Sequence, residues 1–242
     1  MESFVMMALV ATLGTWMVTA LGAATVVFFS SPRVRTLNLM LGFSAGVMTA
    51  AAVWSLLLPA IAQTERDGVF PAWLPALSGL MLGALFIAWL ELMQLRSGTG
   101  SRPLLFAAVT MHNIPEGMAV GLAFALAGSG ESLASAVALA FGIGVQNFPE
   151  GAAVSLPLCG RGRRAAFARG VLSGAVEPVA AALALLAASC IYPIMPWLLS
   201  FSAGAMLYVS ARELLKEAHG LTGSFAYMSG FALMMLLDVA LG

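Results

Sequence analysis

Long apolar runs follow one another along the entire chain, and only a few residues separate each run from the next. Each run is about as long as the 20 or so residues that a helix needs to cross a bilayer. Backbone groups in lipid must be hydrogen-bonded within their own segment, and barrel strands are half as long, so α-helices are predicted. The sequence therefore predicts an all-α polytopic integral membrane protein with eight transmembrane helices, at 4–29, 37–62, 72–95, 103–127, 132–158, 165–189, 194–215 and 221–241.

The composition agrees with that architecture. Of the 242 residues, 61% are hydrophobic and 9% are Asp, Glu, Lys or Arg, whereas about a quarter of the residues in a soluble domain are charged. A single transmembrane domain over residues 1–242 is therefore expected, without a separate soluble domain. The 11 basic and 11 acidic residues cancel, which argues against a partner such as nucleic acid, whose binding depends on neutralised phosphates.

The basic residues fall almost entirely on one side of the predicted topology. When connections and helix ends are assigned alternately to the two faces of the membrane, one face receives only Arg66. Because Lys and Arg are retained on the cytoplasmic side, the N- and C-termini are predicted to lie outside. The short connections favour a bacterial inner (plasma) membrane. The other basic residues, on the predicted inner face, are Arg33, Arg35, Arg96, Arg102, Arg161, Arg163, Arg164, Arg169, Arg212 and Lys216.

Two distant stretches of the chain are similar to each other. Residues 41–60 have the sequence LGFSAGVMTAAAVWSLLLPA, and residues 199–218 have the sequence LSFSAGAMLYVSARELLKEA. Both contain FSAG followed two residues later by a methionine. Convergent use of small residues for helix packing is one explanation. Because the two copies run in opposite directions in the predicted topology, an inverted repeat around helices 4 and 5 is the other, and many transporters are built in this way.

Two related motifs lie in the middle of consecutive predicted helices. HNIPEG in the fourth helix and QNFPEG in the fifth each place a neutral ligand-forming side chain four residues before a carboxylate. His112 therefore shares a helix face with Glu116, and Gln146 shares one with Glu150. The two clusters are expected to meet inside the membrane, because the two helices run antiparallel.

The asparagines and prolines of these motifs have separate consequences. Asn113 and Asn147 lie three residues before the same glutamates, so each glutamate can face two neighbouring sites and bridge two cations. Pro115 and Pro149 donate no N–H, which frees backbone carbonyl groups and favours a kink. Irregular backbone is tolerated at membrane depth only against protein or water, so the motifs are expected to face the interior of the bundle.

The sixth predicted helix adds a third carboxylate, Glu177, followed by a proline. Each charge at the middle of a bilayer costs a few kcal/mol, so Glu116, Glu150 and Glu177 together suggest a bound cation. Protonated or hydrogen-bonded glutamates are the alternative, but they leave the imidazole and the asparagines unexplained. Imidazole, carboxylate and amide oxygen suit zinc, iron(II), manganese or cadmium. Met48 in the second helix either adds a thioether ligand or fills the apolar core.

The paired HNxPEG-like motifs resemble those of the ZIP (Zrt/Irt-like) family of divalent metal transporters. Eight spans, external termini and the position of the motifs in the middle of the chain match too, so the resemblance covers essentially the whole chain. Gln146 together with FSAGVM is more similar to the bacterial GufA-like branch than to other members. The resemblance implies a carrier that moves zinc and related cations into the cytoplasm by an elevator-like, alternating-access movement of helices 4 and 5 against a scaffold.

The same resemblance implies a binuclear metal site. One ion is bound by His112, Glu116, Gln146 and Glu150 with Met48 within reach, and a neighbouring ion is bound by Asn113, Glu116, Asn147, Glu150 and Glu177. Zinc or another divalent metal is then the transported substrate, and neither an organic cofactor nor enzymatic activity is expected. The expected partners are divalent metal ions and the lipid bilayer, and a homodimer is left open.

Some residues depart from the family pattern. Many members have a histidine-rich loop between helices 3 and 4, whereas RSGTGSRP at 96–103 contains no histidine. Many members also have histidine where this chain has Gln146, which leaves one imidazole in the main site. The ionisable residues near helix ends are interpreted as solvated, snorkelling, path-lining or exit-site groups, and they are Glu91, Glu213, Glu217, His219 and Asp238.

Two other classes of function are weighed against a metal carrier. An intramembrane zinc metallohydrolase normally needs a site with two histidines, but the two histidines of this chain lie in different predicted helices. A proton-coupled carrier for an organic solute would use the glutamates as a relay. Such a carrier would be expected to show aromatic or basic groups at mid-membrane, and the basic residues all lie at connections or helix ends.

Overall fold

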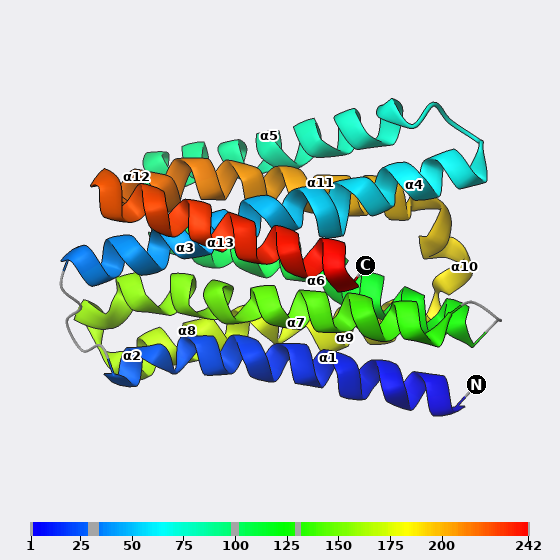
Figure 1. The fold of residues 1–242 in the computed structure, drawn as a ribbon, viewed down its shortest axis with the longest axis horizontal. Helices are drawn as coiled ribbons and strands as arrows, with labels where there is room; N and C mark the ends of the chain where they lie inside the picture. The colour runs from blue at the N-terminus through cyan, green and yellow to red at the C-terminus, as the bar shows by residue number, and fades with distance from the viewer. Residues whose placement is uncertain (1, 29–33, 98–101, 129–131, 242) are drawn as a thin grey trace.

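The computed structural model describes residues 2–28, 34–97, 102–128 and 132–241. Over these residues the chain forms helices and no strand, which confirms the all-α prediction. The long helices lie side by side along one axis of the molecule (Figure 1). The α-helices, long and short, are α1 (Glu2–Ala23), α2 (Thr25–Phe28), α3 (Val34–Ala51), α4 (Leu58–Asp67), α5 (Trp73–Ser97), α6 (Arg102–Ala127), α7 (Leu133–Ser155), α8 (Arg163–Gly174), α9 (Val176–Leu186), α10 (Ala188–Ile191), α11 (Met195–Val209), α12 (Leu215–Glu217) and α13 (Gly220–Leu241).

Within the described residues, six helical stretches are long and apolar enough to cross a membrane. They correspond to six of the eight predicted segments. The other two predicted segments form α6 and α7, which have 26 and 23 residues and contain the polar motifs, but they are not among the six. The polytopic membrane architecture is confirmed, and the count of eight stays a prediction. The six stretches are Ser3–Phe28, Val34–Asp67, Trp73–Met93, Arg163–Leu186, Ala188–Arg212 and Gly220–Ala240.

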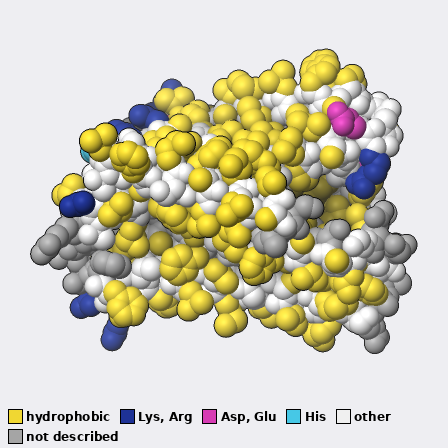
Figure 2. All heavy atoms as spheres, in the orientation of Figure 1, with side chains coloured by type: hydrophobic (Ala, Val, Ile, Leu, Met, Phe, Trp, Pro, Cys, Tyr) yellow, Lys and Arg dark blue, Asp and Glu magenta, His cyan; other side chains and the backbone are white. Residues whose placement is uncertain are grey.

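The surface of the molecule is apolar where lipid would contact it. Figure 2 shows hydrophobic side chains across the middle of the visible face, with Lys and Arg side chains toward its ends. Large apolar side chains are strongly exposed, and Leu186, Phe28 and Leu221 are 86%, 83% and 79% accessible. Apolar patches of this extent are rare on monomeric soluble proteins and suit a protein that lies in a bilayer.

Glycines hold α3 and α13 close together. A Cβ atom added at Gly46 of α3 would overlap the carbonyl oxygen of Tyr227 in α13. In the opposite sense, a Cβ atom at Gly230 of α13 would overlap the carbonyl oxygen of Phe43 in α3. The two backbones therefore touch at both crossings, which only residues without a side chain permit.

The pair formed by α11 and α5 repeats this arrangement. A Cβ atom at Gly204 of α11 would overlap the carbonyl oxygen of Leu80 in α5, and one at Gly83 of α5 would overlap that of Phe201 in α11. Phe201 and Gly204 begin and end the second FSAG copy, as Phe43 and Gly46 begin and end the first. Figure 1 shows that α3 and α11 run in opposite directions.

Each FSAG copy is also followed by a π-helical turn. One turn covers Ala52–Leu57 and the other covers Ser210–Leu214, and both begin at the same distance from their FSAG motif. A π-helical turn widens the helix locally and often marks a functional position. The two similar sequences therefore share local backbone conformation as well as partner geometry.

The predicted helix at 165–189 is broken in its middle. Its first part, α8, ends at Gly174, and α9 begins at Val176. The N–H of Ala175 bonds to the carbonyl of Leu172 at 3.3 Å, which is a tighter turn than in an α-helix. Pro178 cannot donate to the carbonyl of Gly174, so the helical ladder is interrupted there. The break places Glu177 in the first turn of α9.

Candidate metal site

The HNIPEG and QNFPEG motifs meet in the interior between α6 and α7. The Nε2 group of Gln146 donates a hydrogen bond of 2.6 Å to Oε1 of Glu116, which links the two motifs directly. Both helices continue through the prolines of their motifs. Apart from His112, all the predicted ligands in the two motifs and in the sixth predicted helix are fully buried. They are Asn113, Glu116, Gln146, Asn147, Glu150 and Glu177.

The three buried amides are held by their nitrogen ends. In addition to the bond from Gln146, the Nδ2 group of Asn113 donates to the carbonyl oxygen of Ser173 at 3.0 Å. The Nδ2 group of Asn147 donates to the carbonyl oxygen of Thr15 at 3.2 Å. Among the described residues, the side-chain oxygens of all three amides have no hydrogen-bond partner.

Unpartnered oxygens of this kind need a physical explanation. A buried polar atom without a partner costs about 1–3 kcal/mol, so three of them in the paired motifs of α6 and α7 are unusual in a folded protein. Amide oxygens are good ligands for divalent cations, alone or with carboxylates. The donor set around Glu116 and Glu150 therefore fits a bound divalent cation.

Glu177 lies in a network of donors from α1 and α7. The hydroxyl group of Thr15 donates to its Oε2 atom at 2.5 Å, and the hydroxyl group of Thr19 lies 3.5 Å from its Oε1 atom. The Nδ2 group of Asn147 lies 3.0 Å from each carboxylate oxygen. Neither threonine was among the site residues predicted from the sequence. Their spacing with Thr12 along one face of an otherwise apolar helix is the signal that points to them.

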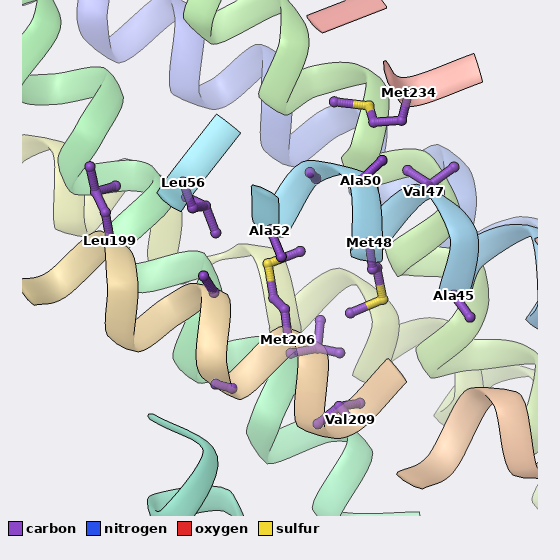
Figure 3. Packing of buried hydrophobic residues seen from close by; sticks show 14 of the residues in the cluster. Ala45, Val47, Met48, Ala50, Ala52, Leu56, Leu199, Met206, Val209 and Met234 are labelled. Carbon is purple, nitrogen blue, oxygen red and sulfur yellow. The ribbon is translucent and has the colours of Figure 1, made fainter. Parts of the chain in front are cut away.

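Two predicted ligands, His112 and Met48, are not placed by the structure among these buried polar side chains. His112 lies in α6, but its side chain is outside the described part of the structure. Met48 is fully buried in an apolar cluster that also contains Met206 of the second FSAG copy (Figure 3). Among the described residues, no three His, Cys, Asp or Glu side chains converge closely enough to hold a metal ion by themselves. A metal site here therefore needs the amide oxygens or His112.

The structure also places the ionisable residues near the helix ends. Glu91 accepts hydrogen bonds from Tyr208 at 2.6 Å and from Nε of Arg212 at 2.9 Å, so it is paired within the protein and does not snorkel. Asp238 accepts a hydrogen bond of 2.7 Å from Ser55, and both line a cavity of about 550 Å³. His219 is exposed, and the side chains of Glu213 and Glu217 lie outside the described residues.

Comparison with known proteins agrees with the resemblance inferred from the motifs. The model of the ZIP zinc transporter family matches residues 94–238. The chain is 38% identical to the zinc transporter GufA of Myxococcus xanthus, over 97% of this chain and 98% of that protein. It is 35% identical to the zinc transporter ZIP11 of Homo sapiens, over 100% and 99% of the two chains, and 35% identical to the zinc transporter ZIPB of Bordetella bronchiseptica, over 93% and 78%. The chain therefore belongs to the ZIP family, whose members are transport proteins rather than enzymes.

Proposed function

We propose that this protein is a carrier that moves divalent transition metal ions, and zinc above all, across the membrane into the cytoplasm. The observation that carries the proposal is the group of three buried amides in Asn113, Gln146 and Asn147. Their nitrogens are held by the protein and their oxygens have no partner among the described residues. Such oxygens beside two buried glutamates provide the ligands that replace water around a cation as it enters the membrane.

The proposed site is binuclear and consists of the ligands that the family resemblance implies. Glu116 and Glu150 bridge two positions, because each glutamate has a neutral partner four residues before it and an asparagine three residues before it. Cadmium, iron(II) and manganese suit the same ligands. The first position uses His112, Glu116, Gln146 and Glu150 with Met48 in reach, and the second uses Asn113, Glu116, Asn147, Glu150 and Glu177.

The proposed movement is that of one helix group against another. The first group, α1 and α6 to α9, contains the site, and the second, α3, α5, α11 and α13, contains both FSAG copies. The groups meet where α3 contacts α7 and where α11 contacts α6. Apolar cavities of about 390 and 440 Å³ lie beside the contact of α3 with α7, and Phe43, Phe148 and Pro149 line both.

This arrangement supports alternating access through an inverted repeat. The glycine crossings hold the helix pairs of the second group together, whereas the contact of α3 with α7 is flanked by these cavities and includes a hydrogen bond from Ser44 to the carbonyl oxygen of Pro149 at 3.1 Å. We further propose that the protein resides in a bacterial inner membrane with both termini outside.

Metal uptake into proteoliposomes tests the proposed function. The native protein is compared with Glu116→Ala and with the control Glu65→Ala, which removes an exposed carboxylate in α4. We expect saturable zinc uptake by the native protein and by the control, and a loss of about 100-fold or more in Glu116→Ala, which removes a ligand shared by both ions. Cadmium, iron(II) and manganese are measured in the same preparations.

Two results would contradict the proposal. Uptake that persists in Glu116→Ala would place the metal path elsewhere in the protein. Absence of flux and of metal binding in a folded native protein would instead favour a metallohydrolase or an organic-solute carrier.

A further inference from the structure

Thr15 of α1 contacts two polar side chains of the candidate site, although α1 contains neither motif. It is 4% accessible. Its hydroxyl group donates to Oε2 of Glu177 at 2.5 Å, and its carbonyl oxygen accepts a hydrogen bond of 3.2 Å from Nδ2 of Asn147. The carbonyl oxygen of Thr12 lies 3.0 Å from the same hydroxyl. The carboxylate is closer and is the stronger acceptor for the single hydroxyl proton.

These contacts fix the orientation of the Asn147 amide. Its Nδ2 group faces three acceptors, the two carboxylate oxygens of Glu177 and the carbonyl oxygen of Thr15. If the amide were turned by 180°, its own oxygen would face these acceptor oxygens, and the hydrogen bonds that Nδ2 donates to them would be lost. The Oδ1 atom of Asn147 is therefore not the atom that faces these acceptors; it is buried, and within the described part of the chain it has no hydrogen-bond partner.

Asn113 in the other motif provides an internal comparison. Its Nδ2 group also donates to a carbonyl oxygen, that of Ser173 in α8, at 3.0 Å. Among the described residues, Asn113 makes no hydrogen bond to a carboxylate, whereas Asn147 donates to that of Glu177, which Thr15 holds in turn. Both asparagines thus donate to a backbone carbonyl oxygen. Asn147 also donates to the Glu177 carboxylate, which is held by the Thr15 hydroxyl group.

We propose that Thr15 is a positioning residue for the second metal position, and this inference rests on the proposed function of the site. Its hydroxyl group donates to Glu177 and its carbonyl oxygen accepts from Nδ2 of Asn147, so Thr15 orients two of the ligands proposed for that position. Residues behind the direct ligands orient them in many metal sites, and their loss typically lowers metal affinity by about 10- to 100-fold.

The test compares four full-length proteins, purified in the same detergent. Thr15→Val removes the hydroxyl group and keeps the branched shape, and Thr15→Ser keeps the hydroxyl group. Thr12→Val is the matched control, because Thr12 is equally buried in α1 but its hydroxyl bonds within its own helix, to Ala8 at 2.9 Å. Zinc affinity and the number of bound ions are measured by equilibrium dialysis, zinc uptake is measured in proteoliposomes, and melting temperatures are recorded without metal.

We expect Thr15→Val to lower the affinity for the second zinc ion by about 10-fold or more. Thr15→Ser should recover most of that affinity, and Thr12→Val should match the native protein. Equal affinities in Thr15→Val and the native protein would overturn the inference, as would an equal loss in Thr15→Ser, which would indicate lost packing. If Thr15→Val does not fold, Thr15→Ala is measured under the same criteria.

A double-mutant cycle with Glu177→Gln separates this inference from the proposed function. If Thr15 acts through Glu177, the two substitutions should be strongly non-additive, and Thr15→Val should have little further effect in the Glu177→Gln protein. Additive effects would overturn the inference and leave the proposed function intact. A folded native protein that neither binds nor transports zinc would overturn both.

Discussion

At the scale of single residues, the candidate site depends on amide groups whose two ends have different roles. Gln146 uses its nitrogen to hold Glu116 and leaves its oxygen available as a ligand. An imidazole at this position would offer one nitrogen as a ligand and the other as a donor, so glutamine preserves both capacities without a second histidine. Gln146, which departs from the usual family pattern of histidine, is therefore compatible with the proposed metal site.

Zinc affinity is expected to fall as the pH falls. A metal ion binds deprotonated carboxylates and neutral imidazole, so protons compete with zinc for Glu116, Glu150 and His112. Lowering the pH fills these groups with protons and weakens binding, by about tenfold per pH unit for each proton that zinc must displace, and raising the pH restores it. Equilibrium dialysis at several pH values with a folded protein measures the effect. An affinity that does not change with pH would show that these groups are not ligands.

At the scale of helices, glycine decides which surfaces can meet. Gly46 lies against the backbone of α13, whereas Gly14 of α1 has no atom within 4 Å of the position that a Cβ would occupy. The two glycines look alike in the sequence, because both lie within long apolar helices. Only the neighbouring backbone distinguishes a packing glycine from one that is free to change.

The substitution Gly46→Ala is expected to destabilise the protein. The added Cβ would overlap the carbonyl oxygen of Tyr227, and separating α3 from α13 should lower the free energy of unfolding by about 1–3 kcal/mol. Gly14→Ala should leave stability unchanged or raise it slightly, since alanine is a better helix former. Thermal unfolding followed by size-exclusion chromatography measures both variants. Equal melting temperatures would contradict the close approach of α3 and α13.

At the scale of the whole molecule, the two ends of the helix bundle differ. In Figure 1 the N-terminus and α10 lie at one end, the C-terminus lies between the middle of the bundle and that end, and α8 begins at the opposite end. Arg163, Arg164 and Arg169 of α8 are exposed at that opposite end, in agreement with the asymmetry of the basic residues. If the basic end faces the cytoplasm, α10 faces the outside.

Chemical labelling of the two cysteines tests this orientation. Cys190 in α10 is exposed, whereas Cys159 is buried at the other end, and burial raises the pKa of the Cys159 thiol and so reduces its reactive thiolate. A membrane-impermeant maleimide applied to intact cells is expected to label Cys190 within minutes. Cys159 should react only after permeabilisation, and more slowly. Labelling of Cys190 only from the cytoplasmic side would reverse the predicted topology, and Cys190→Ser identifies the labelled position.

The sequence by itself determined the features that depend on local requirements. A lipid-exposed backbone must satisfy its hydrogen bonds within each segment, so long apolar runs had to be helices, and four-residue spacing put the motif side chains on common faces. The same motifs were sufficient to predict the family. The eight-span count and the metal ligands stay predictions, since α6 and α7 carry polar side chains and the His112 side chain is outside the described residues.

Only the tertiary structure decided which polar groups act together. Thr12 and Thr15 look alike in the sequence, but Thr12 bonds within its own helix and Thr15 reaches Glu177. The pairing of Glu91 with Arg212 and the orientation of the Asn147 amide likewise depend on neighbours from distant parts of the chain. The physical reason is that a hydroxyl or amide in an apolar helix can bond to its own backbone or to another helix, and only the packing of helices determines which partner lies within reach.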